Sequence, residues 1–143
     1  MKLVQLEPDD WQRYRDLRLL ALRTDPDAFY STAESDETLS EKQWRRRLEA
    51  ASYVVEGNSS DLGLVTTLPY AEDDAEDGDW QLVSMWVAPE GRGQGVGHRL
   101  RHRCAHVHAR LIANKGNASL LRSRCAHGCA VVPFVPRCPP LGV

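Results

Sequence analysis

A cluster of four glycines within seven residues is the part of this sequence best suited to chemistry. The run Gly91-Arg92-Gly93-Gln94-Gly95-Val96-Gly97 follows a short apolar stretch that ends before Pro89. Glycines let the backbone turn its N–H groups toward a ligand, and the N-terminus of a helix adds a partial positive charge. A strand that leads through this loop into a helix therefore predicts a site for an anionic group such as a phosphate.

Two common phosphate-binding motifs do not fit this loop. The Walker motif ends in Gly-Lys-Ser or Gly-Lys-Thr, whereas this loop ends in Gly97-His98-Arg99. The dinucleotide-binding fingerprint follows the first strand of a βαβ unit, whereas this loop follows the fourth strand that we predict. A bare glycine cluster is also compatible with a flexible turn.

Hydrophobic periodicity predicts the elements that must position the loop. Apolar residues recur at helical spacing over 11–24 and 40–50, and the second segment opens with a capping box of Ser40 and Gln43. Residues 27–39 predict a long polar loop, and 69–78 predict an acidic, solvated connection. Four strands are predicted, over 2–6, 52–56, 62–68 and 79–87. This order indicates a single α/β domain, with a mixed sheet and helices packed on it.

The composition is that of a globular protein. The chain has 143 residues, of which 42% are hydrophobic and 27% are charged, which suits one domain with its own core and excludes an ordinary disordered chain. No apolar run approaches the ~20 residues of a membrane-spanning helix. The first residues reach charge and proline too early for a signal peptide. We therefore expect a cytoplasmic protein with no membrane partner.

The charges divide the sequence into two unlike parts. Residues 1–90 hold nine basic and all 20 acidic residues, whereas 91–143 hold nine basic residues and no acidic one. All five histidines and all four cysteines also lie in the second part. We therefore interpret 1–90 as a globular fragment and 91–143 as a segment of different character.

The loop and the residues before it resemble the acetyl-CoA-binding motif of the GCN5-related N-acetyltransferase (GNAT) family. The core signature of that family is Arg/Gln-x-x-Gly-x-Gly/Ala, which Arg92, Gly95 and Gly97 match. Val87-Ala88-Pro89-Glu90 matches the usual exit from the preceding strand, and the predicted order of elements matches the N-terminal half of the family. The resemblance covers residues 1 to about 100 and implies the GNAT fold, with a mostly antiparallel sheet.

The resemblance also implies a reaction and a binding site. The family transfers an acetyl group from acetyl-CoA, its cosubstrate, to an amine, which attacks the acetyl carbonyl directly in its neutral form. By this resemblance the N–H groups from Gln94 to Gly97 would hold the pyrophosphate, with Arg92 and Gly93 at the loop entry, and the backbone of Met85 to Val87 would pair with the pantetheine arm. The implied site is Met85, Trp86, Val87, Arg92, Gly93, Gln94, Gly95, Val96 and Gly97.

The general base is a separate question. Some family members carry a carboxylate thirteen positions before the motif arginine, and Asp79 holds that position here. Asp79 can equally be a solvent-exposed residue that closes the acidic loop. Glu34, Glu37 and Glu56 are further candidates. The acidic run 72–77 would attract a cationic amine, or would simply be a solvated loop.

The resemblance ends near Leu100. The family continues with a full amphipathic helix, a strand, and a helix whose tyrosine protonates the leaving thiolate. Here helical spacing is weak after Leu100, and no β-rich run precedes Ala130-Val131-Val132. The last tyrosine of the chain is Tyr70, so the usual acid is missing.

Three interpretations of the basic, Cys/His/Pro-rich segment 101–143 remain open. A shift of reading frame in a GC-rich gene would produce its composition and the abrupt loss of family pattern. A basic tail could contact nucleic acid, although Phe134 is its one aromatic residue of the Phe, Tyr and Trp types. The third interpretation is a metal site, for which Cys104, Cys125, His127, Cys129 and Cys138 are the candidate ligands. Their irregular spacing is a weak signal, so we assign no metal ligands.

The sequence therefore predicts an N-acetyltransferase that acts on a small-molecule or peptide amine, with activity impaired by the altered C-terminal part. An incomplete sheet would leave an open edge, which favours a homodimer or a domain swap. Two other functions stay open: a non-catalytic acyl-CoA-binding or interaction module, and a basic nucleic-acid-binding protein on the same scaffold. The acceptor amine is not specified, because the family sets it with variable loops.

Overall fold

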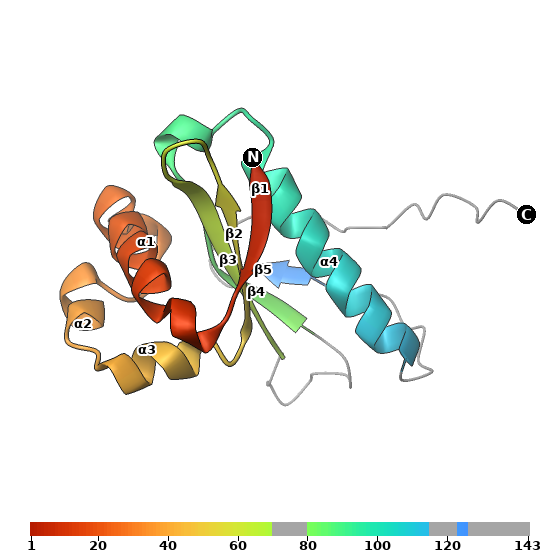
Figure 1. Ribbon diagram of the computed structural model, residues 1–143, viewed down its shortest axis with the longest axis horizontal. Coiled ribbons are helices and arrows are strands. Elements are labelled where there is room, and N and C mark those ends of the chain that lie inside the picture. The colour runs from red at the N-terminus through yellow and green to blue at the C-terminus, as the bar shows by residue number, and fades with distance from the viewer. Residues whose placement is uncertain (70–79, 115–122, 126–143) are drawn as a thin grey trace, which may run out of the picture.

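A five-stranded sheet with helices on both faces forms the centre of the fold (Figure 1). The computed structural model describes residues 1–69, 80–114 and 123–125. Neighbouring strands from β1 to β4 are antiparallel, and β5 is parallel to β4, which confirms the predicted mixed, mostly antiparallel sheet. In their order across the sheet, the strands are β1 (Lys2–Leu6), β2 (Ala51–Glu56), β3 (Asp61–Pro69), β4 (Trp80–Val87) and β5 (Ser123–Cys125).

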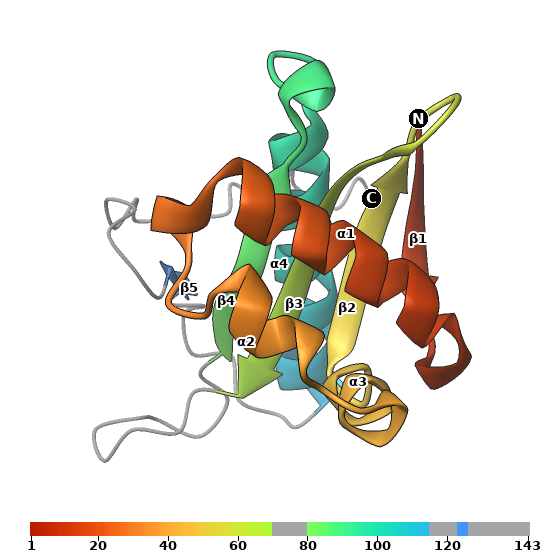
Figure 2. The ribbon, with the colours of Figure 1, turned by 90° about the vertical axis from the view of Figure 1, so that its left-hand side faces the viewer.

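Each face of the sheet is covered by its own helical layer (Figure 2). On one face lie α1 (Trp11–Thr24), α2 (Ala33–Glu37) and α3 (Glu41–Arg47), and on the other lies α4 (Val96–Asn114). Successive side chains of a strand point to opposite faces. Val54 and Leu64 accordingly join the core under α1 and α3, whereas Val55 and Val65 join the core under α4.

Most of these elements lie close to their predicted bounds, and Ser40 and Gln43 form the expected capping box. Residues 27–39 differ, because they contain α2 rather than a loop alone. Asp36 of α2 is buried and accepts hydrogen bonds from Arg18 of α1 and Arg47 of α3. This contact among three helices stabilises α2. Because the contact is polar and involves residues far apart in the sequence, hydrophobic periodicity does not predict α2.

The helix after the glycine loop is longer than expected. Because helical spacing is weak beyond Leu100, the sequence predicts no full helix there. This prediction is wrong, because α4 continues to Asn114. Val96, Leu100 and Cys104 recur every four residues and are 1%, 0% and 1% exposed against the sheet. These three positions dock the helix, so its other residues can be polar. The sequence predicts no strand between this helix and the apolar run at Ala130, yet β5 lies there. The run at Ala130 is outside the described residues.

No helix among the described residues, α4 included, is both long and apolar enough to cross a membrane.

A bulge in β4 changes which of its side chains face each helical layer. Thr66 of β3 pairs with Val83, but Leu64, two residues earlier, pairs with Trp86, three residues later. Ser84 lies inside the bulge with a φ of 55°, in the left-handed region that residues other than glycine rarely adopt. Trp86 consequently packs in the core under α1, whereas unbroken alternation from Val83 would turn it toward α4.

Replacement of Leu100 by alanine tests whether α4 is docked through its buried stripe. Deletion of a fully buried leucine side chain costs about 2–5 kcal/mol, so Leu100→Ala should lower the free energy of unfolding in urea by about that amount. Arg101→Ala, at an exposed position on the same helix, should change it by less than about 0.5 kcal/mol. Equal effects of the two substitutions would contradict the docking of α4 on the sheet.

Candidate active site

The glycine loop, residues 91–97, joins the end of β4 to the first turn of α4. Gly93 and Gly95 have φ angles of 76° and 79°, which residues with a Cβ atom rarely adopt. A Cβ atom at either position would meet no protein atom within 4 Å. The loop is held from within, because the Nε2 of Gln94 donates to the carbonyl of Glu90 at 2.6 Å. The loop is therefore a fixed structure that borders open space.

Backbone N–H groups without an acceptor gather at this loop. The N–H of Arg99 donates to the carbonyl of Gly95, and this is the first hydrogen bond of the helical ladder. The family resemblance predicts that the Gln94 N–H binds phosphate, but this group instead donates to the carbonyl of Gly91 at 3.3 Å. Together with the positive end of the helix dipole, the remaining amides can bind an anion. Those without a hydrogen-bond acceptor in the described part of the chain are Gly93, Gly95, Val96, Gly97 and His98.

β4 presents an open edge next to the loop. β5 pairs only with residues 80–82 of β4, so in the described ranges the rest of β4 has no strand on that side. The N–H of Ala88 donates to β3, and backbone groups alternate between the two edges of a strand. The N–H and C=O groups of Met85 and Val87 therefore face the open edge, and those of Trp86 face β3.

Asp25, at the C-terminal end of α1, connects this loop to the opposite helical layer. Its Oδ2 accepts hydrogen bonds from Trp86 Nε1 at 2.7 Å and from Arg92 Nη2 at 2.5 Å. The Nε of Arg92 also donates to the carbonyl of Val87 at 3.1 Å. The hydrogen bond from Trp86, and after it the Arg92 guanidinium, lower the pKa of Asp25 below its usual value. Arg92 thus braces the loop entry through Asp25, a partner 67 positions away that local sequence patterns do not reveal.

The candidate bases are dispersed. Asp79 and the acidic run 72–77 lie outside the described residues. Glu56 accepts a hydrogen bond from Arg13 at 2.8 Å, and Glu37 pairs with Arg23. Glu34 is exposed on α2. The structure therefore does not assemble Glu34, Glu37 and Glu56 into one catalytic group.

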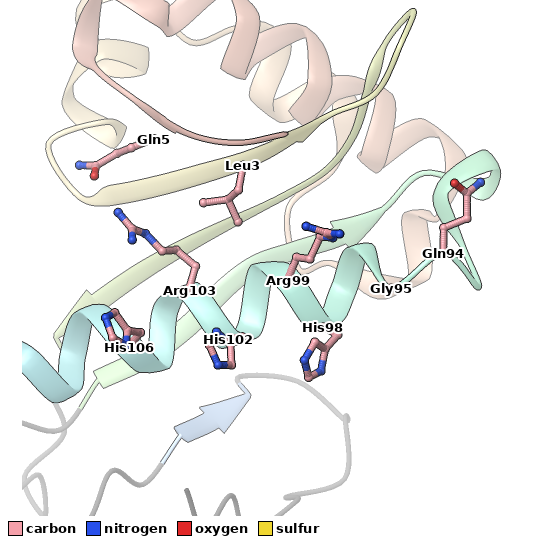
Figure 3. Close-up of a pocket in the computed structure, with 9 residues that line it drawn as sticks. All are labelled: Leu3, Gln5, Gln94, Gly95, His98, Arg99, His102, Arg103 and His106. Carbon is pink, nitrogen blue, oxygen red and sulfur yellow. The ribbon is translucent and has the colours of Figure 1, made fainter. Parts of the chain in front are cut away.

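A hollow of about 850 Å³ runs beside α4 from the glycine loop toward β1 (Figure 3). Leu3 lines it from β1, and Arg99 and Arg103 point from α4 toward that strand. On another side of the helix, the rings of His98 and His102 stack with their centroids 5.9 Å apart. The first turns of α4 thus add cationic side chains to the free amides of the loop, a combination that suits phosphate groups.

The residues considered as metal ligands are not assembled in the part of the chain that the structure describes. There, no group of three or more His, Cys, Asp or Glu side chains could hold a metal ion. Cys104 is packed against the sheet, and burial raises the pKa of its thiol to about 12. Cys125 belongs to β5, whereas His127, Cys129 and Cys138 lie outside the described residues.

The sequence model described as the acetyltransferase (GNAT) family matches residues 9–119, which is more than half of the chain. The chain belongs to the GNAT family. The match continues past Leu100, where the resemblance seen in the sequence ends, and includes the whole of α4. No protein of curated function matches the sequence.

Solved structures of GNAT proteins share the fold. A GNAT family acetyltransferase from Brucella melitensis in complex with acetyl-CoA is 21% identical, with a TM-score of 0.61, over 90% of this chain and 77% of that chain. The PaiA N-acetyltransferase of Thermoplasma acidophilum in complex with coenzyme A is 15% identical, with a TM-score of 0.59, over 81% and 75%. An aminoglycoside acetyltransferase from an uncultured soil metagenomic sample is 16% identical, with a TM-score of 0.63, over 91% and 81%. At these identities the likeness establishes the fold alone.

Asp25→Asn tests the ionic part of the brace on the loop. Because the pKa of Asp25 is lowered in the folded state, its charged form stabilises the GNAT fold above the pKa of about 3.9 of an unfolded Asp. That contribution is lost as the pH falls through the lower, folded pKa. The wild-type chain should therefore have a higher free energy of unfolding than Asp25→Asn near neutral pH, and the difference should shrink in acid.

Urea unfolding followed by tryptophan fluorescence measures this difference. Asp27→Asn removes an exposed carboxylate two positions away and is the matched control, for which no pH-dependent difference is expected. A deficit of Asp25→Asn that stayed constant from neutral pH into acid would show that Asp25 does not act through its charge.

Proposed function

We propose that this GNAT protein is an N-acetyltransferase that uses acetyl-CoA as its cosubstrate and an amine as its acceptor. The observation that carries the proposal is the position of the open edge of β4 directly beside the free amides of the glycine loop. A ligand with an extended amide-containing arm and a pyrophosphate requires these two features side by side. Membership of the acetyltransferase family and the relatives solved with acetyl-CoA or coenzyme A support it.

The residues present fit coenzyme A. The free amides of the glycine loop would hold the pyrophosphate, and the open space beside Gly93 and Gly95 leaves room for it. The edge groups of Met85 and Val87 would pair with the amides of the pantetheine arm. Arg92, held by Asp25 and the Val87 carbonyl, would support the loop that makes these contacts.

The cosubstrate supplies the acetyl thioester, and the protein must orient it and handle a proton. The open edge of β4 would place the pantetheine arm along the strand, so that its reactive end lies near the bulge at Ser84. Only a neutral amine can attack the carbonyl, so a base must take its proton, directly or along a chain of water molecules. We assign this role to Asp79, just before β4, on the family resemblance of that position.

A non-catalytic acyl-CoA-binding module is the second candidate. The family's usual acid is a tyrosine in the C-terminal half of the fold, and this chain has no tyrosine after Tyr70. Without that acid the leaving thiolate must be protonated by water or by another group. A chain of this kind would keep coenzyme A binding and lose part or all of the transfer.

Calorimetric titration with coenzyme A, combined with chromatographic detection of acetylated product, separates the two candidates. The amine panel consists of amino acids, polyamines and aminoglycosides. If the protein is an enzyme, it should bind acetyl-CoA and acetylate at least one of these amines, with one coenzyme A released for each acetylated product. Binding without conversion of any amine supports the module. Absence of binding and of thermal stabilisation at millimolar coenzyme A would refute both.

Gly95→Asn tests the glycine loop. Asparagine tolerates the left-handed φ of Gly95 better than other side chains do, so the free energy of unfolding should change little. Its side chain would occupy the space proposed for the pyrophosphate, so the affinity for coenzyme A should fall at least about tenfold, a loss of about 1.4 kcal/mol. Gly57→Asn, in the β2–β3 turn, is the contrasting variant, because a Cβ there meets Leu62 at 2.9 Å and should destabilise the fold without a specific loss of affinity. Unchanged affinity in Gly95→Asn would contradict the assigned pyrophosphate site.

Asp79→Asn tests the assigned base. A positioned base contributes about 10²–10⁴-fold to a proton transfer, so kcat should fall by about 10²-fold or more while the dissociation constant of acetyl-CoA stays the same. Asp77→Asn removes the same charge from the adjacent acidic run and should leave kcat within about twofold of wild type, because a solvated charge acts weakly. Equal losses in the two variants would assign Asp79 to general electrostatic attraction instead.

A further inference from the structure

A second cavity, of about 250 Å³, lies on the face of the sheet opposite α4. Its walls come from α1, from the end of α3, from the second half of β3 and from the middle of β4. We call it the arginine cavity, because three arginines line it: Arg18 of α1, and Arg46 and Arg47 at the end of α3. No acidic residue lines it among those that the structure describes.

Arg18 has an N–H group that the protein does not satisfy. The residue is 6% exposed, its Nε donates to Asp36 at 3.3 Å, and its Nη2 donates to Ser31 at 2.7 Å. Its Nη1 is buried and has no hydrogen-bond partner within the described ranges. The ring of Phe29 lies 4.5 Å from the guanidinium carbon and restrains it. A fixed, buried guanidinium with a free N–H is prepared for an acceptor from outside the protein.

The arginine cavity also has an excess of positive charge. Asp36 accepts two hydrogen bonds from Arg47, at 2.9 and 3.2 Å, in addition to the one from Arg18. One carboxylate therefore serves two guanidinium groups. Arg46 is exposed and forms no ion pair within the part of the chain that the structure describes. Three arginines against one carboxylate leave the cavity cationic, which favours an anionic ligand.

The arginine cavity reaches β4 at the bulge. Ser84 lines the cavity, and the next residue, Met85, turns its backbone to the open edge on which the acetyl group is proposed to lie. Ala50, Leu68 and Val83 supply apolar wall between the arginines and the strand. A short ligand with its anionic end at the arginines would have its other end beside the bulge.

We propose that the arginine cavity binds a carboxylate of the acceptor, so that the acceptor is an amino acid or a similarly small amino carboxylate. The inference rests on the proposed acetyl transfer, because only that reaction gives a role to the amine at the other end of the ligand. The planar guanidinium fork matches a carboxylate. The apolar wall suits the methylene groups between the carboxylate and the amine, and a volume of about 250 Å³ admits a small molecule.

Arginine side-chain NMR tests the carboxylate site without any need for catalysis. N-acetylglycine is the probe, and N-acetylglycinamide, which has the same shape and no charge, is its control. The Nε–H signals of Arg18 and Arg47 should shift saturably with the carboxylate and not with the amide. No saturable shift at tens of millimolar, an equal response to the amide, or tighter binding of inorganic phosphate would overturn the assignment.

Arg46→Gln removes one cavity cation at an exposed position, where the fold is not at risk. The loss of a charged hydrogen bond should weaken N-acetylglycine binding about tenfold. Lys42→Gln makes the same change of charge one turn earlier on α3, outside the lining of the cavity, and should leave the affinity unchanged. Equal losses of affinity in the two variants would show that the arginine acts only through long-range electrostatic attraction, and would refute a specific site.

The same variants separate this inference from the proposed function. Arg46→Gln should raise the KM of an amino acid acceptor and leave the dissociation constant of coenzyme A unchanged. Efficient transfer to amines, with no preference for those that carry a carboxylate over their amides, would refute the carboxylate site and leave the N-acetyltransferase intact. Carboxylate binding at the arginines without coenzyme A binding would refute the proposed function instead.

Discussion

Ser84 has a φ of 55° in the middle of β4, within a bulge that gives β4 one more residue than β3. The extra residue shifts the register of β4 against β3. A non-glycine residue in this region costs about 1–3 kcal/mol and persists only where its surroundings fix it. Here regular pairing fixes both sides, Val83 with Thr66 before the bulge and Trp86 with Leu64 after it. The bulge thereby brings Ser84 to the arginine cavity, the Trp86 side chain to the α1 layer, and the Met85 backbone to the open edge.

The orientation of Trp86 in turn determines how the glycine loop is held. Because the indole faces α1, its N–H meets Asp25, and the same carboxylate oxygen then receives Arg92 from the loop entry. Arg92 also donates a hydrogen bond to the Val87 carbonyl, which ties the loop entry back to the end of β4. One carboxylate therefore connects α1, β4 and the loop, so the free amides are oriented before any ligand arrives. Such preorganisation spares a ligand the entropic cost of ordering the loop.

Sequence patterns predicted the features that depend on near neighbours. The first four strands, α1, α3 and the glycine loop follow from periodicity, capping and glycine spacing, each of which is visible within a few residues. The bulge, α2 and the Asp25 brace could not be predicted in this way. The bulge at Ser84 depends on how β4 pairs with β3, and Asp36 and Asp25 find partners far along the chain. α4 was underestimated for another reason. Its docking needs only Val96, Leu100 and Cys104, too few apolar positions to stand out among its arginines and histidines.

The division of charge in the sequence corresponds to an arrangement around β4. Arg99, Arg101 and Arg103 of α4 form no ion pair within the described ranges, and no acidic residue follows the glycine loop in the sequence. Positive charge therefore collects on the α4 face of the sheet, and the arginine cavity adds a second cationic site on the α1 face. An anionic cosubstrate and an anionic acceptor would be attracted to opposite faces of one strand, and the sheet would keep their charged ends apart. Their uncharged reactive ends could then meet only where the strand is interrupted, which is at the bulge.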